Sequence, residues 1–254
     1  MDSRRAEIGD NGGPPTHALP HSARMPRILA VVPAAGQGTR IGDPVPKQYV
    51  PVAGRPMMFH ALAALAKVSR IERIFPVLAP GDPHWARHDG SALGAKVEPL
   101  FAGGGSRAQS VLNALDALEG QAAKDDWILV HDAARPCIRS ELVERFLDEL
   151  AGDTVGGLLA VPVADTLKSA AEDRRVAATI PRLNLWRAQT PQMFRYELLR
   201  RALAALPDAT DESQAVEALG KSPRLVEGEN GNLKVTFAED LAIAAMILAQ
   251  RGRA

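Results

Sequence analysis

Residues 28–40 read Ile-Leu-Ala-Val-Val-Pro-Ala-Ala-Gly-Gln-Gly-Thr-Arg, an apolar run that passes directly into a glycine-rich turn. The apolar run predicts a buried strand, and a small turn at the end of a strand lets backbone N–H groups approach phosphate closely. Arg40 and Lys47 add two positive charges to the turn and to the segment after it. Together these features predict a loop that holds a polyphosphate and neutralises its charge.

This loop differs from the two commonest glycine-rich phosphate loops. A Walker A loop needs the pattern G-x-x-x-x-G-K-[ST], which the sequence does not contain. The dinucleotide fingerprint needs a third glycine where Ile41 stands, and Gly42 comes one residue later. Two cations in one loop also suit a triphosphate better than the pyrophosphate of a dinucleotide.

The composition indicates a globular protein with a sizeable core and no strong charge bias. The 254 residues are 46% hydrophobic, and 30 Lys and Arg balance 30 Asp and Glu. A broad basic surface for nucleic acid is therefore not supported. Cys137 is the single cysteine, which excludes an intrachain disulfide and favours a reducing cytoplasm. No apolar run reaches the length of a membrane span.

Short apolar segments alternate with helical ones from Arg27 onward, which predicts a Rossmann-like, doubly wound and mostly parallel α/β sheet. Ligands of such sheets bind beyond the carboxyl ends of the strands. We expect residues 1–24 to form a disordered tail and residues 25–254 to form a single domain. The expected strands are Ile28–Val32, Arg73–Ala79, Val97–Ala102, Trp127–His131, Gly157–Val163, Arg224–Val226 and Leu233–Val235. The expected helices are Met57–Val68, Arg107–Leu118, Ser140–Leu150, Tyr196–Leu206, Asp211–Leu219 and Ala238–Gln250.

The alternation weakens between about residues 164 and 188. This segment is polar, contains the charged run 173–175, and has only a short β-prone piece, Val176–Ile180. The pattern predicts a protruding β-arm rather than core. Because such arms often exchange between subunits, we expect a homodimer.

Two further motifs place polar groups near strand ends. Residues 103–105 are three glycines, followed by Ser110, and would let a flat base approach the backbone; the alternative is a tight turn with a helix cap. Asp132 and Arg135 follow the strand that begins at Trp127. Asp132 suits a ribose hydroxyl, a substrate hydroxyl or magnesium, and Arg135 suits a phosphate. A structural ion pair between them is the alternative.

The remaining polar motifs are weaker signals. Residues 165–168 (Asp-Thr-Leu-Lys) and 189–192 (Gln-Thr-Pro-Gln) flank the arm; in isolation they fit solvated loops better than a polar pocket. Lys234 lies in a β-prone segment and in isolation fits an exposed strand residue. His84 and His88 have helical spacing, but no third ligand accompanies them, so no zinc site is predicted.

In combination, these motifs make the chain from about Arg27 to its end resemble the cytidylyltransferases of the non-mevalonate isoprenoid pathway. The resemblance rests on P-A-A-G-x-G-x-R, P-K-Q, the glycine turn with Arg107 and Ser110, H-D-A-A-R-P, D-T-x-K, Q-T-P-Q and L-K-V-T. It implies a nucleotidyltransferase that transfers CMP from CTP to 2-C-methyl-D-erythritol 4-phosphate and releases pyrophosphate. It also implies dependence on magnesium, or another divalent cation, and a homodimer joined through the arm.

The resemblance also implies residue roles. Arg40 and Lys47 would stabilise the pentacoordinate transition state, and Lys234 would bring the substrate phosphate into line. Magnesium would be held mainly by the CTP phosphates, with Asp132 as a further candidate ligand. The residues assigned to the nucleotide are Ala34, Ala35, Gly36, Gly38, Gly104, Ser110, Asp132 and Ala133, with Gly104 and Ser110 at the cytosine. The residues assigned to the methylerythritol phosphate are Asp132, Arg135, Thr190 and Lys234.

The chain departs from the family's pattern at two positions. Some members carry an arginine just before Asp-Thr, where this chain has Ala164, so Arg182, Lys168 or Lys234 is expected to take over its role. Gly105 stands where an acid is often found. The candidate arm residues are therefore Ala164, Asp165, Lys168 and Arg182.

Two other functions remain open at this point. A ribitol-5-phosphate cytidylyltransferase looks similar through the arginine and lysine loop. A non-catalytic CTP-binding protein would keep the fold without turnover. Three cations around one phosphate, Arg40, Lys47 and Lys234, argue against the second, because binding alone does not need them.

Overall fold

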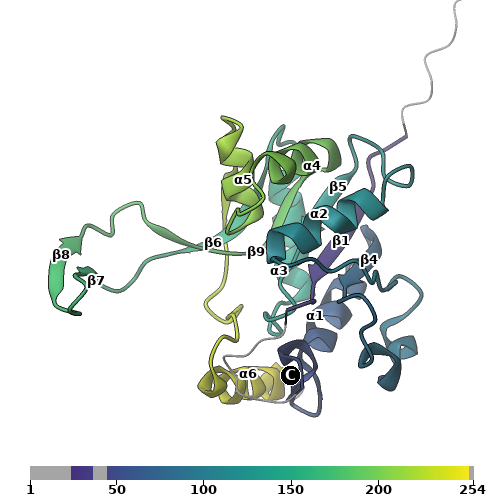
Figure 1. Cartoon of the computed structure of the whole chain (residues 1–254), viewed down its shortest axis with the longest axis horizontal. Helices are drawn as coiled ribbons and strands as arrows, with labels where there is room; N and C mark the ends of the chain where they lie inside the picture. Colours follow the sequence, from purple (N-terminus) through teal and green to yellow (C-terminus); the bar gives the residue numbers. More distant parts are fainter. Residues whose placement is uncertain (1–23, 37–44, 252–254) are drawn as a thin grey trace, which may run out of the picture.

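A six-stranded sheet with helices on both faces forms the centre of the computed structural model, which describes residues 24–36 and 45–251 (Figure 1). In sheet order its strands are β10 (Arg224–Glu227), β6 (Gly156–Pro162), β9 (Trp186–Arg195), β5 (Trp127–Val130), β1 (Ile28–Pro33) and β4 (Ile71–Val77). Within this sheet β9 runs antiparallel to β5 and β6, and the other neighbouring pairs are parallel. The doubly wound, mostly parallel sheet is therefore confirmed. The predictions for residues 1–23, Gly38 and Arg40 lie outside the described residues.

Alternate residues of β1 face two different cores. Ala30 and Val32 pack on one face of the sheet with α1 (Met57–Ala66) and α3 (Ser140–Leu150). Leu29 and Val31 pack on the other face with α2 (Arg107–Ala117), α4 (Tyr196–Ala205) and α5 (Glu212–Ala218). Burial on both faces explains why β1 is a continuous apolar run. Among the described helices, none is long and apolar enough to cross a membrane. The last described α-helix is α6 (Ala238–Arg251).

Strand β9 corrects the prediction for residues 189–192. The sequence pattern fits a solvated loop there, but the structure places these residues inside the sheet, where Gln189, Thr190 and Gln192 are buried. A strand with polar residues and a proline does not have the composition of a central strand, because proline cannot donate a ladder hydrogen bond. The register between β6 and β9 shifts opposite this stretch, between Leu158 and Ala160.

The predicted strand over residues 97–102 is wrong, because the structure has no continuous strand there. The segment runs beside β4, but its pairing is limited to isolated bridges at Val97 and Leu100. Pro99 between them has no backbone N–H, so a continuous ladder is interrupted there.

The predicted strand over residues 233–235 is also wrong. The backbone N–H of Val235 donates to the carbonyl of Ala134 over 2.8 Å, and the carbonyl of Val235 accepts from the ammonium of Lys47. Tertiary contacts with two loops therefore take the backbone groups that a strand would use. The segment is held at the carboxyl ends of the strands.

The arm contains a separate hairpin. β7 (Leu167–Ala170) and β8 (Val176–Ile180) pair with each other and stand away from the central sheet (Figure 1). β9 then leads from this side back into the sheet. Leu183 and Val176 leave 83% and 64% of their surface exposed.

Candidate active site

A cavity of about 520 Å³ opens at the carboxyl ends of β1 and β5. Its walls come from the turn after β1, the glycine turn before α2, the turn after β5, and the segments that hold Lys47 and Lys234. All of the described residues assigned to the nucleotide line this cavity: Ala34, Ala35, Gly36, Gly104, Ser110, Asp132 and Ala133. The structure therefore brings together motifs that lie up to 200 residues apart in the sequence, from Ala34 to Lys234.

The second glycine turn owes its shape to close packing. A Cβ atom on Gly103 would lie 2.3 Å from the Cβ of Ala35, and one on Gly104 would lie 2.4 Å from the side chain of Gln109. The hydroxyl of Ser110 accepts from the N–H of Gly104 over 3.0 Å, and it also contacts a carbonyl of the same turn. Ser110, assigned to cytosine, thus holds the turn itself.

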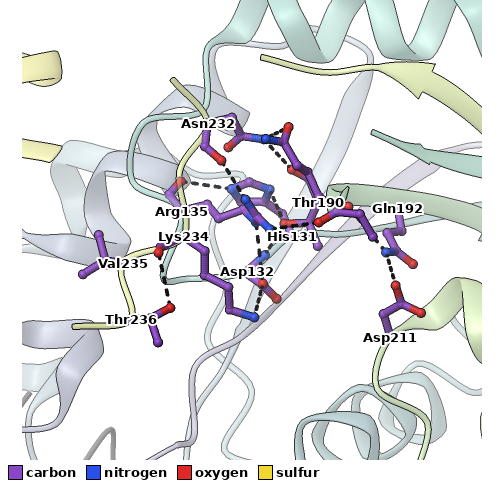
Figure 2. Close-up of polar contacts among 12 residues, drawn as sticks. His131, Asp132, Arg135, Thr190, Gln192, Asp211, Asn232, Lys234, Val235 and Thr236 are labelled. Atoms are coloured by element: carbon purple, nitrogen blue, oxygen red, sulfur yellow. Dashed lines mark hydrogen bonds and ion pairs between the residues drawn. The ribbon is translucent and has the colours of Figure 1, made fainter. Parts of the chain in front are cut away.

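Asp132, two residues after the end of β5, binds cations from distant parts of the chain. The Nε of Arg107 donates to its Oδ1 over 2.8 Å. The Nζ of Lys234 lies 2.9 Å from its Oδ2, as Figure 2 shows. Burial works to raise the pKa of Asp132, but the charges of Arg107 and Lys234 outweigh burial and hold the pKa well below its usual range. The carboxylate is therefore ionised throughout the physiological range.

Arg135 is buried and ties two segments of the site together. Its Nη1 donates to the carbonyl of Asn232 over 2.7 Å, and its Nη2 donates to the carbonyl of Ala188 over 3.3 Å. The side chain of Asn232 in turn donates to the carbonyl of Thr190 over 2.8 Å (Figure 2). Among the described residues, the Nε of Arg135 has no hydrogen-bond partner and remains as a donor. The guanidinium thus fixes the Lys234 segment against β9.

A second cavity of about 240 Å³ adjoins the first. Arg107, Asp132 and Lys234 line both cavities. All residues assigned to the methylerythritol phosphate line the second one: Asp132, Arg135, Thr190 and Lys234. Two ligands bound in the two cavities would therefore meet at one carboxylate and two cations.

Lys47 also lies in this region. It lines the larger cavity, and its ammonium donates to the carbonyl of Val235, the residue after Lys234. Two of the three cations assigned to catalysis thus lie on segments in direct contact. Arg40, the third, lies outside the described residues.

His131 is a buried residue of the site whose role the sequence pattern did not reveal. Its Nε2 lies 3.3 Å from the carbonyl of Arg135, and its Nδ1 lies 3.1 Å from the hydroxyl of Thr190 (Figure 2). Because a carbonyl only accepts, Nε2 carries the proton and Nδ1 accepts from Thr190. The same hydroxyl accepts from the N–H of Asp132 over 3.0 Å. A neutral histidine therefore orients Thr190 and the turn after β5.

The arm candidates lie apart from both cavities. Neither lining includes Ala164, Asp165, Lys168 or Arg182. The ammonium of Lys168 donates to the hydroxyl of Thr179 on the neighbouring strand of the hairpin, over 2.6 Å. Within one chain, these residues therefore do not line the cavity that holds the residues assigned to the methylerythritol phosphate.

Glu212 is a second residue that sequence reasoning missed. It is fully buried at the start of α5 and accepts two hydrogen bonds from Arg107. An acid in the first turn of a helix is an ordinary feature of helix ends, so the pattern carries no signal for this contact.

Metal-binding groups are sparse in the part of the chain that the structure describes. No three His, Cys, Asp or Glu side chains there are arranged to hold a metal ion. Asp132 is the only carboxylate among the described residues that line the larger cavity.

These features define the class of protein. It is an α/β protein whose strand ends carry a glycine-rich turn and several cations, a combination that suits a phosphorylated ligand, and a second polar cavity adjoins the first. Such a site has room and positive charge for two anionic ligands side by side.

Comparison with known proteins identifies the family. The family model of IspD, 2-C-methyl-D-erythritol 4-phosphate cytidylyltransferase, matches residues 28–250, and the chain belongs to this family. The 2-C-methyl-D-erythritol 4-phosphate cytidylyltransferase of Azoarcus sp. (strain BH72) is 56% identical over 226 residues, 89% of this chain and 96% of the relative. The one of Dechloromonas aromatica (strain RCB) is 57% identical over 227 residues, 89% of this chain and 100% of the relative.

Solved structures agree with this assignment. A crystal structure of 4-diphosphocytidyl-2C-methyl-D-erythritol synthase superposes with a TM-score of 0.77 at 38% identity, over 88% of this chain and 98% of that one. The crystal structure of the 2-C-methyl-D-erythritol 4-phosphate cytidylyltransferase of Thermus thermophilus superposes with a TM-score of 0.72 at 32% identity. The match covers 88% of this chain and 99% of that one. Sequence and fold thus point to the same family.

The burial of His131 predicts a pH dependence of stability. Burial, with Arg135 and Arg107 nearby, lowers the pKa of His131 to about 4, whereas its unfolded value is about 6.5. The unfolded state therefore binds the proton first, and stability present above pH 6.5 is lost as the pH falls towards 4. Between pH 7 and 5 the free energy of unfolding should fall about 2 kcal/mol more in the wild type than in His131→Asn.

Urea unfolding in the presence of EDTA at several pH values measures this difference. Parallel curves for the wild type and His131→Asn would show that His131 does not titrate on unfolding.

Proposed function

We propose that the chain transfers CMP from CTP to 2-C-methyl-D-erythritol 4-phosphate, forming 4-diphosphocytidyl-2-C-methyl-D-erythritol and pyrophosphate in isoprenoid precursor biosynthesis. The observation that carries the proposal is the shared wall of the two cavities. There Asp132 lies between Arg107 and Lys234, with one cavity of nucleotide-binding type on one side and a smaller polar cavity on the other. Membership of the family supports the identity of both substrates.

The chemistry requires positioning and charge neutralisation. An oxygen of the acceptor phosphate attacks the α-phosphorus of CTP, the bond from that phosphorus to the bridging oxygen breaks, and pyrophosphate leaves with the electron pair. The nucleophile is already ionised, so no general base is needed and no covalent enzyme intermediate forms. Arg40, Lys47 and Lys234 offset the charge that accumulates where the two anions meet.

The described residues fit a divalent cation that comes with the nucleotide. Magnesium usually keeps several waters and is bound by one or two carboxylates together with substrate phosphates. Asp132 could supply one oxygen, although Arg107 and Lys234 already bind both of its oxygens. We therefore infer that magnesium, or another divalent cation, is held mainly by the CTP phosphates, whose charge it would neutralise.

The arm supports a homodimer. Its exposed apolar side chains belong to the hairpin and to the segment that leads from it into β9, and an isolated two-stranded hairpin is only marginally stable in water. Pairing with the arm of a second copy would cover these side chains. The side chains are Val176, Ile180, Leu183, Leu185 and Trp186.

A cytoplasmic location is also part of the proposal. Cys137 is the single cysteine of the sequence, and its thiol is buried. Burial raises the pKa of this thiol to about 11, so it is protonated and unreactive at neutral pH. Such a chain has no need of an oxidising compartment.

The dimer is tested by exchanging apolar arm residues for charges. The variant Val176→Asp/Leu183→Asp should sediment as a monomer at concentrations where the wild type is a dimer, because two charges would be buried at the interface. Met246→Asp, an exposed apolar position on α6, serves as the control and should leave the dimer intact. A wild type that is monomeric at every concentration contradicts the proposal, as does an arm variant that remains dimeric.

The reaction is tested by pyrophosphate release from CTP and magnesium, with methylerythritol phosphate and ribitol 5-phosphate offered separately. Release with methylerythritol phosphate alone is expected. Release with ribitol 5-phosphate alone would mean that the chain is a cytidylyltransferase with a different acceptor. Binding of CTP without release from either would mean a non-catalytic protein.

Lys47→Ala should lower kcat by about a hundredfold or more in this assay, since a preorganised charge at the reacting phosphates is lost. Lys67→Ala is the matched control, because Lys67 is exposed at the end of α1, away from both cavities. If Lys47→Ala kept a kcat close to that of the wild type, Lys47 would have no role in the transition state.

A further inference from the structure

Glu212 lies behind the site and holds one of its cations. Both terminal nitrogens of Arg107 donate to the carboxylate of Glu212, over 2.7 and 3.0 Å, in a two-pronged contact. Glu212 is 0% exposed and lies 105 residues from Arg107 in the sequence. It lines neither of the two cavities, so it does not touch a ligand in them.

The third guanidinium nitrogen of Arg107, Nε, connects this contact to Asp132 and, through it, to Lys234. Nε donates to Oδ1 of Asp132, and Oδ2 of Asp132 binds Lys234. Glu212, Arg107, Asp132 and Lys234 therefore form a row of alternating charges that ends at the shared wall of the cavities. Each inner member of the row has an opposite charge on both sides.

The geometry of the guanidinium makes Glu212 decisive for this row. A planar guanidinium prefers to bind a carboxylate through two parallel N–H groups. As long as Glu212 occupies both terminal nitrogens, Arg107 reaches Asp132 through Nε alone. Without that charge, the terminal nitrogens of Arg107 would turn towards Asp132 and occupy both of its oxygens, because an unpaired buried cation is costly.

We propose that Glu212 is a positioning residue of the transfer reaction: it confines Arg107 to one oxygen of Asp132 and reserves the other for Lys234. The inference rests on the proposed function, in which Lys234 guides the acceptor phosphate. It explains why a fully buried acid lies at the start of α5 facing the site. Binding of the acceptor phosphate, rather than binding of the nucleotide, therefore depends on Glu212.

The test is the kinetics of Glu212→Gln, a change of nearly equal volume that removes the charge. KM for methylerythritol phosphate should rise about tenfold and kcat should fall about tenfold, while KM for CTP changes much less. The direction of the KM change is informative. Removing a negative charge makes the site more positive, so electrostatic attraction alone would lower KM for an anionic acceptor.

Asp126→Asn is the matched control. Asp126 is also 0% exposed and binds Arg27 through the side chain and backbone, but it lies at the opposite end of β5 from Asp132. Both variants should lower the midpoint of thermal unfolding, because each weakens a buried ion pair. Only Glu212→Gln should change KM for the acceptor. Equal kinetic constants in Glu212→Gln and the wild type would reduce Glu212 to a structural residue.

A double-mutant cycle identifies the route of the effect. If Glu212 acts through Lys234, Lys234→Ala should lower kcat/KM for methylerythritol phosphate far less in the Glu212→Gln background than in the wild type. If the two substitutions lower kcat/KM independently, so that their effects add as free energies, Glu212 does not act through Lys234. Should Glu212→Gln fail to fold, Glu212→Asp, which keeps the charge, gives the same comparison with smaller expected changes. A wild type that releases no pyrophosphate refutes the proposed function itself, which keeps the two failures distinct.

Discussion

One buried carboxylate, that of Asp132, sets the arrangement of the site. A charge that leaves water must be paired, and the cost of leaving it unpaired is several kcal/mol. Arg107 from the start of α2 and Lys234 from the segment after β10 meet this requirement, and Arg135 lies 3.8 Å away on the same turn. Because these cations come from separate parts of the chain, their ion pairs with Asp132 hold three segments together at the carboxyl ends of the strands. The two cavities adjoin there.

Strand β9 is the second constraint, because it places polar side chains inside the sheet. Each needs a partner, and the partners are parts of the site. Gln192 donates to Asp211 at the start of α5 over 2.9 Å, and Thr190 lies between His131 and the backbone of Asp132. The strand also begins at the arm. A single element therefore joins the region proposed for dimerisation to the acceptor side of the site.

The sequence predicts the parts of this structure whose causes are local. The strand β1 and its glycine turn follow from apolar periodicity and backbone chemistry, and the helices follow from their spacing within a few residues. β9 could not be recognised, because Gln189, Thr190 and Gln192 are buried only through partners that lie far away in the sequence. Glu212 is a similar case, since its burial depends on an arginine 105 residues earlier. The roles proposed for Lys234 and Thr190 came only from the resemblance to a family.

The central role of Asp132 is best tested by Asp132→Asn, which keeps the shape of the side chain and removes its charge. The measurement is kcat/KM for methylerythritol phosphate, with circular dichroism and thermal unfolding to show that the fold is retained. The account predicts a loss of about a hundredfold or more, because Arg107 and Lys234 lose the charge that orients both of them. A folded variant whose kcat/KM stays within about twofold of the wild type would contradict the account, since a change that small is under about 0.5 kcal/mol.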